Sequence, residues 1–198
     1  MAQNRFINSV HIDFFGNQVD GDGYGGYNHI GLHGGIGTLY KFNNAKGALG
    51  FEINYAQKGA RLWARPNQGI YQDFKFKLNY IEVPIYYVFE SWGLPFEAGP
   101  TFSYLLDAKR EFNGISSAPT SPYREFELGC VFSMTYPISQ RLFFKFRITN
   151  SISPILDVEN GPFANWSAGS WHRGAGLNIT YFFQPPNFKF KKPSQNEE

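Results

Sequence analysis

The chain has 198 residues with a formal net charge of +2; 19% of its residues are aromatic and only 17% are charged. This length is compatible with a single domain, and the weak, dispersed positive charge gives no indication of a nucleic-acid partner. A single cysteine, Cys130, excludes an intrachain disulfide and a zinc site built on cysteines. No stretch is apolar for about 18 residues in a row, which excludes a transmembrane helix.

The first residues, MAQNRF, lack the basic segment followed by an apolar segment that marks a signal peptide. An added methionine before Ala2 is what a mature exported protein expressed without its leader would show. We therefore expect that a signal peptide has been removed.

Apolar residues alternate with polar ones through most of the chain, whereas the period of an amphipathic helix is nearly absent. Aromatic and β-branched residues, which favour strands, dominate one set of alternate positions. We predict eight strands in chain order. They cover roughly residues 6–17, 28–42, 48–58, 78–90, 95–106, 124–136, 141–152 and 171–183.

The connections between these strands alternate in length. The second and third, fourth and fifth, and sixth and seventh strands are joined by short turns rich in Asn, Gly and Pro (NNAKG, SWGLP and PISQ). The other connections are longer, as in KREFNGISSAPTSP after the fifth strand. Short turns at one end and long loops at the other are typical of an outer-membrane barrel, and an even strand count places both termini at the periplasmic end.

Two classes of barrel fit this alternation, and the composition of the two faces distinguishes them. In a soluble barrel, such as a lipocalin-like protein that binds a small apolar ligand, the apolar face points inward; in a membrane barrel it meets lipid. The polar face here is rich in Gly, Ser, Thr and Asn, which suits the narrow interior of an eight-stranded barrel. We predict an all-β fold: a closed antiparallel up-and-down transmembrane β-barrel with eight strands, short periplasmic turns and long extracellular loops.

A small set of charged residues falls on the polar face and is predicted to form a charge network in the lumen. Its members are Glu52, Glu82, Glu97, Glu127, Lys145 and Arg147. Because buried charges must be paired, Glu82 requires a cation, and Lys58, Lys145 and Arg147 are the candidates. The structural interpretation is a network that fills the barrel; the functional alternative is a path for protons or ions.

Four histidines are also predicted to face the lumen: His11, His29, His33 and His172. The first, second and last strands are neighbours in a closed barrel, so these side chains could meet, but hydrogen-bonded lumen histidines are a simpler interpretation than a metal site. Small outer-membrane barrels include lipid-modifying hydrolases; here Ser9, His11 and Asp13 alternate along one strand and are too extended to form a triad. We therefore expect no catalytic residue, metal or cofactor.

The strand at residues 78–90 has two unusual features. Its outward residues are odd-numbered, whereas the apolar residues just before it are even-numbered, so the alternation changes phase near Tyr80. This predicts a β-bulge at Tyr80, or a segment Asp73–Lys77 that stands above the bilayer. Pro84 cannot donate a ladder hydrogen bond and a closed barrel has no edge, so a bulge beside Pro84 would account for both features.

Three short motifs occur in order along the chain: Tyr55-Ala56-Gln57-Lys58-Gly59, Tyr80-Ile81-Glu82-Val83-Pro84 and Gly99-Pro100. With them, the region from about Gly34 to Phe183 resembles the outer-membrane β-barrel proteins of Bacteroidota often labelled the PorT family. The resemblance implies an eight-stranded barrel in a Gram-negative outer membrane. The family is named after a member needed for secretion through the type IX system, but most members have no assigned role, and the tail of this chain departs from the usual pattern.

The last strand carries a glycine followed by alternating apolar and aromatic residues. These residues are Gly176, Ile179, Tyr181 and Phe183. The pattern resembles the signal of substrates of the outer-membrane assembly machinery, and it is equally the pattern of a barrel strand with a lipid-facing side.

Together these observations predict a barrel at residues 1–183 and a flexible periplasmic tail at residues 184–198. The predicted function is that of a non-enzymatic outer-membrane barrel, a scaffold or accessory subunit of an envelope complex, and the resemblance implies a role in secretion. The alternatives are the soluble ligand-binding barrel and a lipid-modifying outer-membrane enzyme. The expected partners are outer-membrane lipid and lipopolysaccharide, the outer-membrane assembly machinery and another envelope protein.

Overall fold

The structure, a computed structural model, describes residues 5–20, 26–42, 47–69, 71–117, 123–156, 170–186 and 188. Its elements are β1 (Phe6–Asp20), β2 (His29–Lys41), β3 (Gly47–Leu62), the 3-10 turn η1 (Pro66–Gln68), β4 (Phe74–Ser91), β5 (Leu94–Phe112), β6 (Ile115–Ser117), β7 (Phe126–Pro137), β8 (Leu142–Ser151) and β9 (Trp171–Phe182). Of the predicted tail, only residues 184–186 and Phe188 are among the described residues, so the predicted flexibility of that segment stays a prediction.

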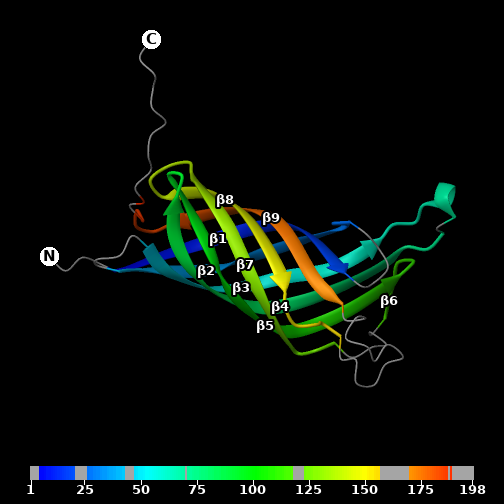
Figure 1. The fold of residues 1–198 in the computed structure, drawn as a ribbon. Helices are drawn as coiled ribbons and strands as arrows, with labels where there is room; N and C mark the ends of the chain where they lie inside the picture. The colour runs from blue at the N-terminus through cyan, green and yellow to red at the C-terminus, as the bar shows by residue number, and fades with distance from the viewer. Residues whose placement is uncertain are drawn as a thin grey trace, which may run out of the picture.

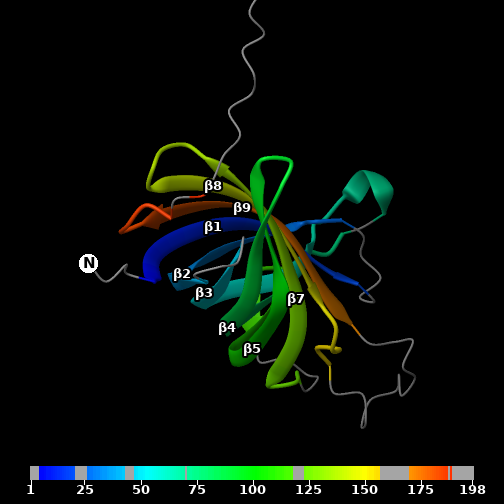
Figure 2. The same cartoon turned by 60° about the vertical axis from the view of Figure 1, so that its left-hand side comes forward.

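Eight strands form a closed barrel (Figure 1 and Figure 2). Neighbouring strands follow the order β4, β3, β2, β1, β9, β8, β7, β5, and the pairing of β4 with β5 closes the circle. Every pairing is antiparallel, including that of the first strand with the last. The predicted fold class is confirmed.

The two ends of the barrel differ as the sequence predicts. The start of β1 and the end of β9 lie at the end with the short turns, which is the periplasmic end of such barrels. There β4 and β5 are joined by two residues only, Trp92 (φ 51°) and Gly93 (φ 78°). Both lie in the left-handed region that tight hairpin turns require, which glycine adopts without strain.

Three neighbouring strands are longer than the rest and project beyond the rim at the long-loop end (Figure 1). They are β3, β4 and β5, with 16, 18 and 19 residues, compared with 10 in β8. The segment after residue 109, predicted as a loop, is instead a hairpin in which β5 continues to Phe112 and β6 returns along it. The turn uses Asn113 and Gly114, a sequence pair typical of hairpins.

The interior is layered along the barrel axis. An apolar cluster at the short-turn end comprises Ile7, Leu39, Ala48, Tyr86, Val88, Val131, Phe143 and Phe182, and Phe188 packs against it. A second apolar cluster at the long-loop end comprises Val19, Ala56, Ala60, Phe76, Leu78, Tyr80 and Ile155. The buried charged residues lie largely between these two clusters, but the register places Glu97 opposite Val88 of the first and Lys58 opposite Leu78 of the second. Apolar and charged side chains together fill the lumen.

The outer surface of the barrel is apolar, in the arrangement expected for contact with lipid. Large side chains such as Ile36 (62% exposed) and Phe126 (70% exposed) recur at alternate positions around the wall. A soluble protein rarely exposes a continuous apolar surface of this extent, so the alternative of a soluble lipocalin-like barrel is wrong. No helix within the described residues is long and apolar enough to cross a membrane.

The change of phase predicted near Tyr80 does not occur on β4. Even-numbered residues of β4 are the more buried ones from Phe76 to Val88, so the apolar residues before Tyr80 face the lumen. The register between β4 and β5 does shift beside Tyr80, but the extra residue is Leu106 of β5. The bulge is therefore on the partner strand, and the apolar residues of β4 form part of the outer apolar layer.

The hydrogen-bonding gap at Pro84 is accommodated without a bulge beside it. On the β3 side, pairing stops between Phe51–Ile85 and Asn54–Glu82 and resumes in the same register. On the β5 side, Pro84 remains opposite Thr101. The ladder thus skips the position of the missing N–H group, and the prediction of a bulge next to Pro84 is wrong.

Candidate functional site

All six residues predicted to form the lumen charge network are buried inside the barrel. Glu52, Glu82, Glu97, Glu127, Lys145 and Arg147 are each at most 3% exposed. Strand alternation explains this placement, because each residue occupies an inward position on β3, β4, β5, β7 or β8. The structure divides them between two clusters at different heights, and each cluster also recruits residues that the sequence analysis did not assign to the network.

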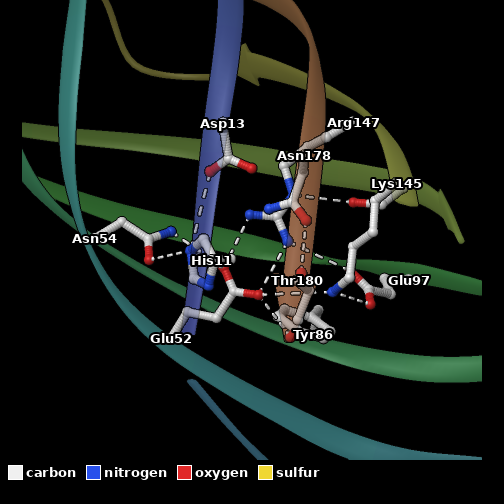
Figure 3. A network of polar contacts seen from close by, with 11 residues as sticks. His11, Asp13, Glu52, Asn54, Tyr86, Glu97, Lys145, Arg147, Asn178 and Thr180 are labelled. Atoms are coloured by element: carbon white, nitrogen blue, oxygen red, sulfur yellow. Dashed lines mark hydrogen bonds and ion pairs between the residues drawn. The ribbon is translucent and has the colours of Figure 1, made fainter. Parts of the chain in front are cut away.

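The Glu52 cluster consists of His11, Glu52, Tyr86, Glu97, Lys145 and Arg147 (Figure 3). The guanidinium of Arg147 donates to both carboxylate oxygens of Glu52, at 2.8 and 3.0 Å. The Tyr86 hydroxyl donates to Oε1 of Glu52 at 2.7 Å, and the amide of Asn54 donates to Oε2 at 3.1 Å. This carboxylate therefore has donors from three strands, β3, β4 and β8.

Glu97 is the second carboxylate of the same cluster. Lys145 Nζ donates to its Oε1 at 2.6 Å, and Arg147 Nη2 lies 3.4 Å from its Oε2. Lys145 also lies 4.0 Å from Glu52, while Nε of Arg147 donates to Ser133 at 3.1 Å. The two cations are thus shared between the two carboxylates (Figure 3).

The Lys58 cluster consists of Lys58, Glu82, Ser103, Glu127 and His172, and it lies nearer the long-loop end. Lys58 Nζ is 2.6 Å from Oε2 of Glu82 and 2.8 Å from Oε1 of Glu127. His172 Nδ1 is 2.5 Å from Oε2 of Glu127, and the Ser103 hydroxyl donates to Glu82 at 3.1 Å. Of the three cations proposed for Glu82, Lys58 is the one that contacts it.

The electrostatic balance of the two clusters differs. Removing a charge from water costs several kcal/mol per ion, and only close, hydrogen-bonded partners offset that cost. In the Glu52 cluster two carboxylates meet two cations. In the Lys58 cluster one ammonium group meets two carboxylates, and the second carboxylate also takes a hydrogen bond from His172.

The four histidines are all buried, but they do not converge. His11 Nε2 is 2.9 Å from Oδ1 of Asn54 and 3.6 Å from Glu52, so it belongs to the Glu52 cluster. His33 contacts the Gln57 carbonyl oxygen at 3.1 Å and stacks on Phe15. Among the residues that the structure describes, no group of three His, Cys, Asp or Glu side chains is arranged as metal ligands.

Ser9, His11 and Asp13, the residues considered for a hydrolase-like set, all point into the sealed interior. Nε2 of His11 lies 3.9 Å from Asp13 and is held by Asn54 and Glu52. Each of the three residues is at most 6% exposed, so the set has almost no contact with solvent. The geometry therefore suits structural pairing in the barrel rather than access by a substrate.

Tyr86 is a member of the network that was not among the six charged residues predicted from the sequence. Its ring fits because Gly50 lies opposite on β3: a Cβ on Gly50 would be 2.1 Å from Cε2 of Tyr86. A glycine facing a tyrosine across two inward strand positions is a signal that a sequence analysis could have used. Asn54 and Ser103 were missed because short polar side chains are common at inward barrel positions.

The residues of the assembly-type pattern lie on both sides of β9. Gly176 faces the lumen, where a Cβ would come within 2.7 Å of the Phe15 ring. Ile179, Tyr181 and Phe183 face outward and are 45%, 39% and 55% exposed. This placement fits a barrel strand, while recognition by an assembly machine stays a prediction.

Comparison with known proteins supplies the family context. A family model described as "Outer membrane protein beta-barrel domain" matches residues 3–157. The structure is similar to Neisserial surface protein A (14% identity, 89% of this chain and 96% of that chain, TM-score 0.51). It is also similar to Ail, the attachment invasion locus protein of Yersinia pestis, solved with the heparin analogue sucrose octasulfate (16% identity, 90% and 99%, TM-score 0.50). At these identities the likeness concerns the fold, and no curated protein matches the chain.

Proposed function

The chain belongs to the family of outer-membrane proteins with a β-barrel domain and lies in the outer membrane, and from this premise we propose that it is a non-conducting, non-enzymatic scaffold or accessory subunit of an envelope complex. The observation that carries the proposal is the sealed lumen. Paired charges and two apolar clusters fill it, and the buried charged residues and histidines are each at most 5% exposed. A barrel without an open interior acts through its outer surfaces.

The sealed lumen argues against a path for ions. An ion that entered from the periplasmic side would first meet the layer that contains Phe143 and Phe182, whose rings pack edge to face at 5.2 Å. It would then have to displace ion pairs whose side chains are only 1–3% exposed to solvent. Eight strands leave room only for side chains, so both steps would require the barrel to deform.

The finer assignment to the Bacteroidota PorT family, and with it a secretion-related role, is supported by how two of the family-like motifs meet. Lys58 of the Tyr55–Gly59 motif and Glu82 of the Tyr80–Pro84 motif form the ion pair at 2.6 Å. In this proposal the two motifs together supply the Lys58–Glu82 ion pair of the Lys58 cluster. The envelope partner would be contacted through the outer loops and the projecting ends of β3, β4 and β5, through the barrel wall, or through the periplasmic tail at residues 184–198.

Two further partners belong to the proposal. The outer-membrane assembly machinery would recognise β9 through its outward residues Ile179 and Tyr181 and through Phe183, which follows directly after the strand. Outer-membrane lipid and lipopolysaccharide would surround the apolar wall.

Conductance in planar bilayers tests the central claim. The purified chain, inserted into a bilayer and checked for insertion by flotation with liposomes, is expected to give no current steps at transmembrane voltages where a porin control conducts. Discrete, ion-selective steps would contradict the proposal.

Affinity purification from native membranes in mild detergent tests the scaffold role. A partner recovered in a fixed ratio supports it, and a chain recovered alone under conditions that preserve known envelope complexes counts against it.

A further inference from the structure

The outer face of β3, β4 and β5 changes from apolar to charged above the membrane band. Four successive rows of outward positions can be followed across these strands from the register. They are Tyr55–Ile81–Tyr104, Gln57–Asn79–Asp107, Gly59–Lys77–Lys109 and Arg61–Lys75–Glu111. The first row belongs to the apolar wall. The last two rows lie beyond the last paired residues of the neighbouring β2 and β7, His33–Ala56 and Tyr104–Phe126, in the part where β3, β4 and β5 extend past the rim (Figure 1).

Four cations, Arg61, Lys75, Lys77 and Lys109, gather in the last two rows and are called the basic patch. Lys77 and Lys109 lie directly opposite each other on β4 and β5. Like charges in that position are destabilising. Lys75 adds a third ammonium group on the same face, and burial together with the neighbouring Lys77 lowers its pKa from the usual value. The patch therefore carries a repulsion that an anion would relieve.

Three carboxylates lie among the four cations and leave one cation over. Arg61 pairs with Asp73 at 2.6 Å, Lys77 with Glu111 at 3.1 Å and Lys109 with Asp107 at 3.3 Å. Among the described residues, Lys75 is engaged in no ion pair, and the effect of Glu111, which raises its pKa, is smaller than those of burial and of Lys77, which lower it.

The opposite wall at a similar height shows a balanced arrangement. There the outward Arg173 of β9 has its own acidic partner, Asp20 of β1, at 2.7 Å. The Arg173–Asp20 pair is thus balanced, whereas the basic patch on β3, β4 and β5 has one cation more than it has carboxylates.

The height and direction of the patch indicate what it faces. Outward tyrosines Tyr55 and Tyr104 end the apolar wall just below it, as aromatic side chains do at the boundary between hydrocarbon and headgroups. The guanidinium of Arg61 lies 3.3 Å from the centre of the Trp63 ring, which adds a further aromatic residue at this level. The four cations therefore point sideways, into the layer where headgroups of the outer leaflet lie.

We propose that the basic patch binds the phosphate groups of a phosphorylated glycolipid in the outer leaflet, the lipid A portion of lipopolysaccharide. The inference deepens the proposed function, on which it rests for the insertion and orientation of the barrel. A molecule in the plane of the membrane reaches these outward side chains directly. A soluble polysaccharide or acidic protein would instead approach the loops from above.

Binding of lipid A by the full-length chain in detergent tests this assignment. Native mass spectrometry is carried out with bisphosphorylated lipid A and, as the matched ligand, with the same lipid after removal of both phosphates. The triple variant Lys75→Gln, Lys77→Gln, Lys109→Gln is compared with Arg173→Gln, which removes a cation at similar height on the opposite wall. Because a lysine near an anionic lipid surface contributes a few-fold in affinity, we expect the triple variant to bind bisphosphorylated lipid A about tenfold or more weakly.

The wild type and Arg173→Gln are expected to retain lipid A equally, and the dephosphorylated lipid is expected to bind all variants alike. The proposal is overturned by equal binding to the triple variant, by equal binding of the dephosphorylated lipid to the wild type, or by complete displacement of lipid A by a soluble sulfated sugar. The last result would identify a site for a free polyanion.

Folding and insertion are checked separately. The unheated barrel is expected to keep its faster migration in gel electrophoresis in every variant. If the triple variant fails this check, Lys75→Gln alone carries the test, because its ammonium group has no ion pair to lose among the described residues. Loss of lipid A binding leaves the conductance result untouched, so the failure of one proposal is distinguishable from the failure of the other.

Discussion

The two buried charge clusters both pair carboxylates inside the barrel, but one has two cations for this and the other has one. In the Glu52 cluster, Arg147 contacts both carboxylates and Lys145 contacts the same two, so either cation can remain when the other is lost. In the Lys58 cluster, a single ammonium group holds Glu82 and Glu127 together. We therefore expect the Glu52 cluster to tolerate the loss of a cation better than the Lys58 cluster does.

The location of the clusters sharpens this contrast. The Glu52 cluster lies above the layer of large rings at the periplasmic end, and Tyr86 belongs to both. The Lys58 cluster lies below the outer apolar layer, in which the Tyr80 ring is 5.1 Å from Lys58 Nζ. Each cluster is thus enclosed by apolar side chains on one side, which strengthens its ion pairs and raises the cost of breaking them.

Substitution of Lys58 by methionine is expected to have the largest effect. It leaves two carboxylates buried near each other with His172 as the remaining basic partner of one of them, and breaking a buried pair typically costs about 3–5 kcal/mol. The free energy of unfolding, measured by urea titration in detergent or lipid with tryptophan fluorescence, should fall by that amount. Adding Glu82→Gln should restore part of the loss.

The exposed Arg141→Met, at the periplasmic turn between β7 and β8, serves as the control for Lys58→Met and should stay within about 0.5 kcal/mol of the wild type. An unfolding free energy for Lys58→Met as close to the wild type as that of Arg141→Met would refute the view that Lys58 holds its cluster together.

Substitution of Lys145 by methionine tests whether the second cation of the Glu52 cluster, Arg147, compensates for the loss of the first. Glu97 loses its 2.6 Å contact, but Arg147 still lies 3.4 Å from it and still binds Glu52. We expect a loss of about 2 kcal/mol, below that of Lys58→Met. In the same urea titration, Lys145→Met combined with Arg147→Met should cost more than the two single changes together, because neighbouring residues that share partners are not additive. Equal losses for Lys145→Met and Lys58→Met would show that sharing a cation gives no protection.

The sequence predicted the barrel and the inward direction of its charges because both depend on alternation, a local property. Glu82 illustrates how far this reaches: its burial and its need for a cation followed from its position between outward residues. Which cation it meets did not follow, because contact across the lumen depends on the relative height of strands. Lys58, on the adjacent strand, meets Glu82, while Lys145 and Arg147 meet Glu97 and Glu52.

The errors have a common physical origin on β4 and β5. The apolar residues before Tyr80 were interpreted as a change of phase, since a polar lumen was assumed along the whole strand. The structure places Phe76 and Leu78 inward because the lumen is closed by an apolar layer at that height. The bulge was sought on the strand that carries Pro84, but an extra residue on either partner shifts the register, and Leu106 of β5 is that residue. A single sequence contains no signal for which of two paired strands has the insertion.

The smallest expected change in the free energy of unfolding concerns two tyrosines, Tyr86 beside the Glu52 cluster and Tyr80 beside the Lys58 cluster. Tyr86→Phe removes the hydroxyl that donates to Glu52 at 2.7 Å, while Arg147 and Asn54 continue to donate to that carboxylate. The loss should be about 1 kcal/mol in the free energy of unfolding. Tyr80→Phe keeps the ring, which lies 5.1 Å from Lys58 Nζ and packs edge to face against the His172 ring at 5.8 Å, and should cost less than about 0.5 kcal/mol. If Tyr80→Phe proved the more costly of the two, the contribution of Tyr80 would lie in its hydroxyl, and the Lys58 cluster would have a further donor that compensates in part for its single cation.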